Sequence, residues 1–276
     1  MHNSIFSASY SETSKIVTRK KFRLNKAGFD NMKISKRIFP TFLTIFFVVP
    51  LFYGIGVWMP RAVSDLLGEE KRAFMLKYDA FSSGFMKFIL IVWVVLSLLI
   101  LIQRKNWGKY TFEAQIHFSV MIIAFNFIVF NLLFRISILG IGLQGTGIIV
   151  VCGMIYIFST IFNLINEMKE KMYGIRKKHI AFKWLLLFTL ISIGLVLINS
   201  LTSRPDDFNF VLYSSSFGLF LVFVVISLLT RFVIYYLILD FYFAKYGEQY
   251  KEKFKITDEQ WYGPRKAKCL AKKKGK

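Results

Sequence analysis

Long apolar stretches alternate with short basic ones along the chain. At about 20 residues each, six apolar segments are long enough to cross about 30 Å of hydrocarbon. They run over residues 38–59, 85–102, 116–134, 147–165, 184–201 and 208–230, and none of them contains Asp or Glu. Backbone polar groups in hydrocarbon must be hydrogen-bonded within their own segment, so such runs predict helices. The pattern predicts an all-α polytopic membrane protein, a bundle of about six transmembrane helices with a C-terminal interfacial helix.

Composition excludes the common alternatives to a membrane protein. The 276 residues are 55% hydrophobic and 19% charged, whereas soluble chains are about 45–50% apolar and about 25% charged. Such a chain is neither disordered nor an ordinary soluble enzyme. Its two cysteines, Cys152 and Cys269, lie far apart, which excludes a secreted disulfide scaffold.

The basic residues predict the orientation of the helices. Of the 37 Lys and Arg residues, nine precede the first span, and eleven follow Asp240. Three more lie in the loop 103–115 and six in the loop 166–183, all on the same side of the predicted membrane. Basic residues concentrate on the cytoplasmic side, so both termini are expected in the cytoplasm of a cell whose plasma membrane the chain spans. The net charge of +21 therefore indicates topology and an anionic inner leaflet as partner, and nucleic acid is not expected.

Four regions follow from this topology. Residues 1–37 form a basic cytoplasmic segment, expected to be disordered or adsorbed to the membrane surface at its start. Residues 38–230 form the six-helix transmembrane domain. Residues 231–263 form interfacial amphipathic helices, and residues 264–276 form a disordered tail with seven basic residues and no acid. Met1 and Met32 both fit as the first residue, and the apolar run from Ile38 is too long for a signal peptide.

After residue 230 the apolar residues form a single stripe along one side of the expected helix. We place Arg231 at the cytoplasmic interface, where its long side chain can reach water. The stripe that follows predicts a helix lying on the inner leaflet or docked on the cytoplasmic loops. Its expected interfacial anchors are Arg231, Phe243, Tyr246, Tyr250 and Trp261.

A short second helix is expected directly afterwards. Thr257 and Gln260 have the spacing of a capping box, in which each side chain bonds the backbone N–H of the other residue. Ile256 and Trp261 can form the accompanying apolar staple, and Gly263-Pro264 is expected to end the helix.

Two loops on the predicted outer side have distinctive patterns. In the loop 60–84, Phe74, Tyr78 and Phe81 would share one face of a surface helix, although a solvated connector fits equally well. Gly140, Gly142 and Gly145 match the glycine pattern of nucleotide-binding loops. That pattern requires a preceding strand, so a tight turn is the better interpretation.

Catalytic and metal-binding patterns are missing from the sequence. His2, His117 and His179 share no ligand spacing, which argues against a metal site. The sequence contains no GxSxG, Walker A or HExxH motif, and no acid lies inside a predicted span. We therefore expect a protein that is not an enzyme and that binds no cofactor or metal.

Polar residues inside the spans predict helix association. Amides can bond across helices or line a polar path; the candidates are Asn126, Asn131, Asn163 and Asn199. Ser214 and Gly218 are four residues apart and offer a small face for close helix packing. Cys152 is expected to be buried as a small apolar residue.

Over its whole length the chain resembles certain bacterial membrane proteins in composition and in the pattern of its helices and loops. Its short helices rich in Phe and Ile, its lysine-rich inner loops and the motif Asp258-Glu259-Gln260-Trp261 are similar to polytopic proteins of low-GC Gram-positive bacteria. Some of these are membrane immunity proteins encoded beside secreted toxins, including type VII secretion toxins. The resemblance implies a non-catalytic protein of a bacterial plasma membrane that binds a secreted, membrane-active toxin. The alternative function is a permease subunit driven by a separate ATPase.

Overall fold

The computed structural model describes residues 4–19, 33–59, 83–102, 106–202 and 210–274, with the single positions 62 and 73. Within these ranges the chain is helical and contains no strand. The surface helix expected in the loop 60–84 lies outside the described residues.

Four of the described helices are long and apolar enough to cross a membrane. The first is continuous from Ile34 to Trp58 and comprises α2 (Ile34–Leu43), the π-helical turn η3 (Thr44–Val48), α3 (Val49–Tyr53) and the π-helical turn η4 (Gly54–Trp58). The others are α7 (Trp107–Tyr173), α8 (Phe182–Thr202), and a helix assembled from α9 (Phe210–Ser216) and α10 (Gly218–Lys245). A fifth apolar helix, α6 (Ser83–Leu99), is shorter.

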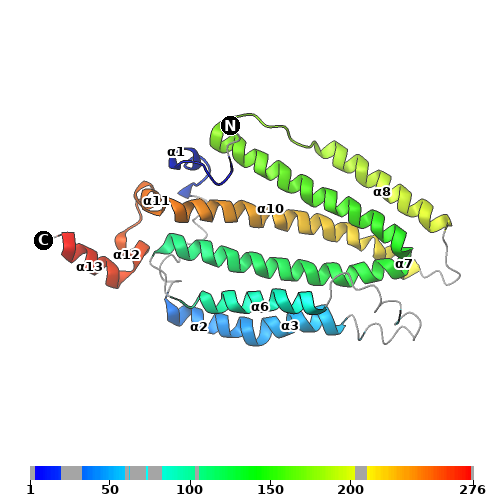
Figure 1. Ribbon diagram of the computed structural model, residues 1–276, viewed down its shortest axis with the longest axis horizontal. Coiled ribbons are helices and arrows are strands. Elements are labelled where there is room, and N and C mark those ends of the chain that lie inside the picture. Colours follow the sequence, from blue (N-terminus) through cyan, green and yellow to red (C-terminus); the bar gives the residue numbers. More distant parts are fainter. Residues whose placement is uncertain are drawn as a thin grey trace.

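One glycine divides the 67 residues of α7 into two arms. Gly142 has φ 74° and ψ 175°, a conformation open to glycine alone. The chain reverses at this point, so that the two arms run in opposite directions (Figure 1). Ser137 and Thr146 face each other across the reversal, with their hydroxyl oxygens 3.0 Å apart. The prediction of a tight turn at this glycine motif is confirmed.

Replacing Gly142 by Ala should strain the reversal by about 1–3 kcal/mol, because the added Cβ is incompatible with this backbone conformation. The purified variant should therefore melt at a lower temperature. Gly147→Ala is the matched control, since its Cβ would meet no atom within 4 Å. Equal melting temperatures for the two variants would contradict the assigned geometry.

The two arms of α7 form the centre of the bundle. α10 packs along α7, and α8, α9 and α6 also contact it. α10 comes close to α7 at Gly153, where an added Cβ would overlap the ring of Phe223 on α10. Cys152 beside it is buried, as predicted. The predicted close packing at Ser214 and Gly218 is wrong for this chain, because Ser214 is exposed and Gly218 has no atom near its Cβ position.

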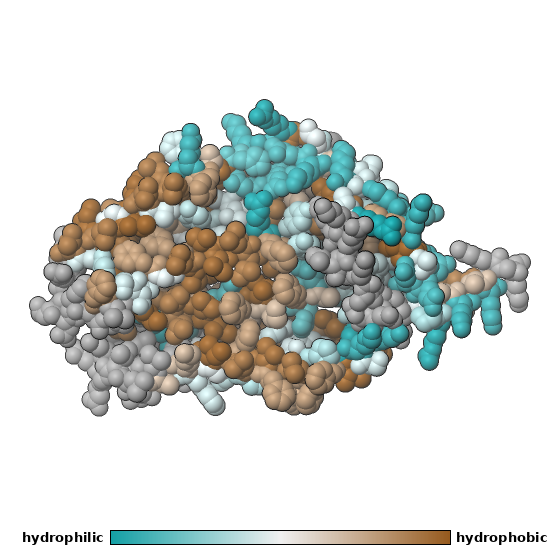
Figure 2. Space-filling view, turned by 180° about the vertical axis from the view of Figure 1, so that it is seen from behind, coloured by the Kyte–Doolittle hydropathy of each residue, from teal (hydrophilic) through white to brown (hydrophobic). Residues whose placement is uncertain are grey.

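Much of the side surface of the bundle is apolar. Figure 2 shows apolar residues across the middle of one face, and polar residues gathered toward the end that carries the C-terminal helices. Phe39, Phe88 and Phe158 are more than 60% exposed. Because a monomer in water rarely exposes large apolar patches, this surface suits a lipid environment.

Three short helices follow α10. They are α11 (Gly247–Lys253), α12 (Asp258–Tyr262) and α13 (Pro264–Lys274). Thr257 and Gln260 form the predicted capping box at the start of α12. The prediction of a disordered tail over 264–276 is wrong up to Lys274, because Pro264 occupies the first helical position and the Ala, Lys and Leu residues after it favour helix.

Candidate functional site

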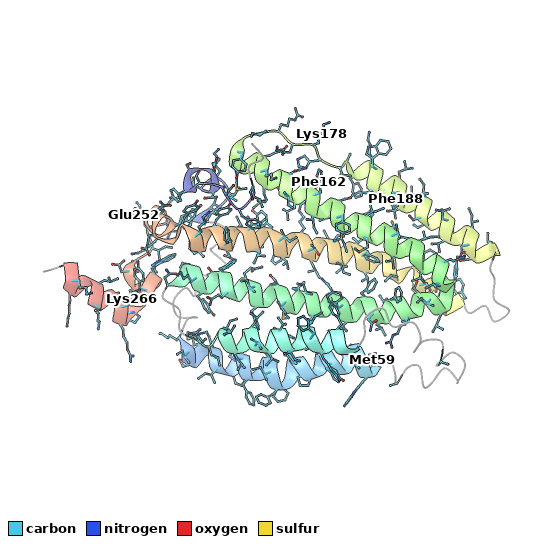
Figure 3. The ribbon with its side chains drawn as sticks, in the orientation of Figure 1. Met59, Phe162, Lys178, Phe188, Glu252 and Lys266 are labelled. Carbon is cyan, nitrogen blue, oxygen red and sulfur yellow. The ribbon has the colours of Figure 1, made fainter. Side chains whose placement is uncertain are left out.

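The N-terminal residues dock on the end of α10. Residues 4–17, together with α11 and α12, are called the cap. The end of the bundle that carries the cap is called the basic end. Met59 lies at the opposite end from Glu252 and Lys266 (Figure 3). The sequence-based expectation of a disordered or surface-adsorbed start is wrong for residues 4–17, because buried apolar side chains hold them to the bundle.

Three tyrosines hold this segment: one near the end of α10, one at its junction with α11 and one within α11. The Tyr242 hydroxyl donates to the carbonyl of Ile5 and accepts the N–H of Ala8 at 3.2 Å. The Tyr246 hydroxyl donates to the Ala8 carbonyl at 2.6 Å. The Tyr250 hydroxyl donates to Thr13 Oγ1 at 2.8 Å. Spacings of four residues place the three rings in one row along the chain.

An apolar core lies beneath these hydrogen bonds. Ile16 and Val17 are almost fully buried, as are Met168 and Met172 at the end of α7. The two pairs belong to one cluster with Phe243 and Trp261. Residues 4–17 are therefore part of the same folded unit as the C-terminal helices.

Trp261 holds α12 in this core. Its ring is fully buried and lies against Gly108 and Gly247, where an added Cβ would come within 3.0 Å of the ring. Its indole N–H donates to Glu248 Oε1 at 3.2 Å. The Tyr262 hydroxyl donates to the same carboxylate. Glycines on both sides therefore create the space that the indole fills.

Most of the predicted interfacial anchors lie inside protein. Phe243, Tyr250 and Trp261 are fully buried, and Tyr246 is partly buried against the same cluster. The sequence predicted that this helix either lies on the inner leaflet or docks on the cytoplasmic loops. These contacts favour docking on protein, since fully buried side chains do not reach lipid. Arg231 remains half-exposed and pairs with Glu167 of α7 at 2.5 Å.

Among the ionisable groups of the cap, Tyr250 and Glu12 have shifted pKa values. Burial raises the pKa of the Tyr250 phenol, so this hydroxyl remains a donor to Thr13 over the physiological range. Hydrogen bonds from the Ser9 N–H and hydroxyl hold the pKa of Glu12 below its usual value. The pair forms a capping box at the start of α1 (Tyr10–Thr13).

Removing the hydroxyls of Tyr242 and Tyr246 should loosen the N-terminal segment. Tyr242→Phe with Tyr246→Phe leaves buried backbone groups of Ile5 and Ala8 without these partners, at about 1–3 kcal/mol for each group. Trypsin cleavage after Lys15 should then accelerate at least about tenfold. Tyr236→Phe, on the same helix but in none of these hydrogen bonds, should leave the cleavage rate unchanged. Equal cleavage rates in both variants would show that the Tyr242 and Tyr246 hydroxyls do not hold residues 4–17 in place.

The predicted asparagines Asn163 and Asn199 bond backbone groups of other segments. The Asn163 amide donates to the Ile180 carbonyl at 3.0 Å and accepts the Ile180 N–H at 2.7 Å, which fixes the chain entering α8. Asn199 donates to the Ile141 carbonyl at 3.4 Å, directly before the reversal in α7. Asn131 is buried, and Asn126 is half-buried.

A cavity lies at the basic end between the first helix, α6 and α7. Its volume is about 340 Å³, and its lining includes Lys36, Arg37, Tyr110 and His117. Arg37 is 5% exposed, donates to the carbonyls of Ile100 and Ile102, and lies over the Tyr110 ring at 5.3 Å. These carbonyls follow the end of α6, where a helix leaves its last carbonyls without N–H partners. Sequence reasoning missed this cavity because its lining comes from three separate segments.

His117 and Ser97 lie side by side in this lining without forming a nucleophile and its base. His117 Nε2 is 2.8 Å from the Ser97 hydroxyl and accepts the Trp93 indole N–H at 3.0 Å. An indole N–H can only donate, so it occupies the one lone pair that could take a proton from Ser97. The arrangement serves to hold α6 against α7.

Within the described ranges, no group of three or more His, Cys, Asp or Glu residues could hold a metal ion. Comparison with protein-family models, with curated proteins and with solved structures finds no match to the chain.

Proposed function

We propose that the chain crosses a bacterial plasma membrane six times, with both termini in the cytoplasm. α6 and the two arms of α7 each count as a crossing, together with the first helix, α8 and the helix over α9 and α10. The observation that supports this most strongly is the contact of residues 4–17 with Tyr242, Tyr246 and Tyr250. Segments before the first span and after the last can meet only on one side of the membrane, which requires an even number of crossings. The concentration of Lys and Arg at this end favours the cytoplasm.

The proposed activity is protection of this membrane by binding a secreted, membrane-active toxin. Binding needs no turnover, so this activity requires no catalytic group. The apolar side surface supports an encounter within the bilayer, because helices in lipid associate through van der Waals packing. The resemblance to toxin-immunity membrane proteins supports the same function.

The test is expression of the secreted protein encoded beside this chain in a susceptible bacterium. Membrane potential and growth are followed with and without the chain. We expect the chain to preserve both, and to do so equally well when residues 265–276 are deleted. Unchanged depolarisation despite confirmed insertion of the chain would refute protection against that toxin. Copurification with an ATPase would then favour the permease alternative.

A further inference from the structure

We infer that the cavity at the basic end binds a phosphate-bearing anion, in the form of the headgroup of an anionic phospholipid. This site is independent of the proposed toxin-binding activity. Its lining brings together the cations of Lys36 and Arg37 with hydroxyl groups of Thr41, Thr44 and Tyr110. Among the described residues that line the cavity, none is acidic. Cations and hydroxyls in one concave site are the groups that hold phosphate oxygens.

Arg37 is positioned in advance for such a ligand. The residue as a whole is 5% exposed, and its guanidinium is oriented by the carbonyl groups of Ile100 and Ile102 and by the Tyr110 ring. A guanidinium keeps its charge at any physiological pH and offers donors in a fixed plane. Little conformational entropy is therefore lost when an oxyanion binds beside it.

The surroundings favour a lipid headgroup over a free ion. Lys36 and Arg37 directly precede the apolar run that begins at Ile38, so the cavity lies at the depth of the inner-leaflet headgroups in the proposed topology. On the following turn, Phe39 is 70% exposed and Phe42 is 49% exposed. Their rings can contact acyl chains while the phosphate occupies the cavity. A pocket of about 340 Å³ also has the volume of a small-ligand site.

The test uses the purified full-length protein in detergent, mixed with phosphatidylglycerol and phosphatidylcholine. Retained lipid is counted by native mass spectrometry. The unaltered chain should retain phosphatidylglycerol in preference to phosphatidylcholine. Lys36→Gln should weaken retention about fivefold, and the further change Arg37→Gln should weaken it by about the same factor again. Lys183→Gln is the matched control, because it removes a charge at the same end outside the cavity lining, and it should retain as much phosphatidylglycerol as the unaltered chain.

Two further measurements keep the outcome clear. Lys36 is exposed, so Lys36→Gln should fold normally, and it carries the test alone if the double variant does not fold. Inorganic phosphate is added in excess as a separate arm. Retained phosphatidylglycerol that phosphate displaces supports the lipid site, whereas phosphate binding without lipid retention would overturn the lipid assignment. Equal phosphatidylglycerol retention by all variants would overturn the site itself.

Discussion

Trp261→Ala is expected to open the cap. The substitution removes a fully buried indole from between Gly108 and Gly247, and neither glycine has a side chain to fill the space. Loss of a buried Trp costs about 3–5 kcal/mol, so the melting temperature of the purified protein should fall by at least about 6 °C. Protease cleavage within α11 and α12 should accelerate, because α12 loses its contact with Phe243 and the hydrogen bond to Glu248.

Trp184→Ala is the control for this prediction. Trp184 lies near the start of α8 and is 60% exposed, so it has the same side chain as Trp261 but is not buried. Its loss should change the melting temperature little. If both tryptophan variants melted alike, Trp261 would not be the core residue that the structure makes it.

Gly153→Leu is expected to force α10 away from α7. An added Cβ alone would overlap the Phe223 ring, and a whole leucine side chain has no space between the two helices. Overpacking costs about 1–3 kcal/mol and occasionally more. The melting temperature should fall, while Gly194→Leu, at a position with no neighbour within 4 Å of its Cβ, should be tolerated.

A second change can show that the overlap with Phe223 is the cause. Gly153→Ala and Phe223→Ala should each be destabilising, but the double variant should lose less stability than the two single losses added together, because the ring that meets the new methyl group is gone. Strictly additive effects of the two changes would place their side chains out of contact.

Apolar run length and glycine pattern were sufficient to predict the helices and the turn at Gly142. Both are local properties, since a run of apolar residues and a backbone angle depend on few neighbours. The capping box at Thr257 was predictable for the same reason. The burial of Phe243 and Tyr250 was harder to predict, because an aromatic stripe looks the same whether it faces lipid or protein.

The partners of these residues lie too far along the chain for a pattern to reveal. Residues 4–17 are polar enough to suggest a solvated segment, yet Tyr242 lies 234 residues from the backbone N–H of Ala8 that it binds. The Arg231 partner Glu167 was missed because it lies just beyond the predicted span 147–165. The cavity around Arg37 likewise needs three segments in their folded positions.

The most direct test of the proposed topology is cysteine labelling in whole cells and in inverted membrane vesicles. The exposed native Cys269, and separately Lys178→Cys combined with Cys269→Ser, should react with a membrane-impermeant maleimide only in inverted vesicles. Leu143→Cys and Ser203→Cys, each combined with Cys269→Ser, should react only in whole cells. Labelling of residue 143 and residue 178 from the same side would show that the arms of α7 do not both cross the membrane, and would contradict the proposal of six crossings.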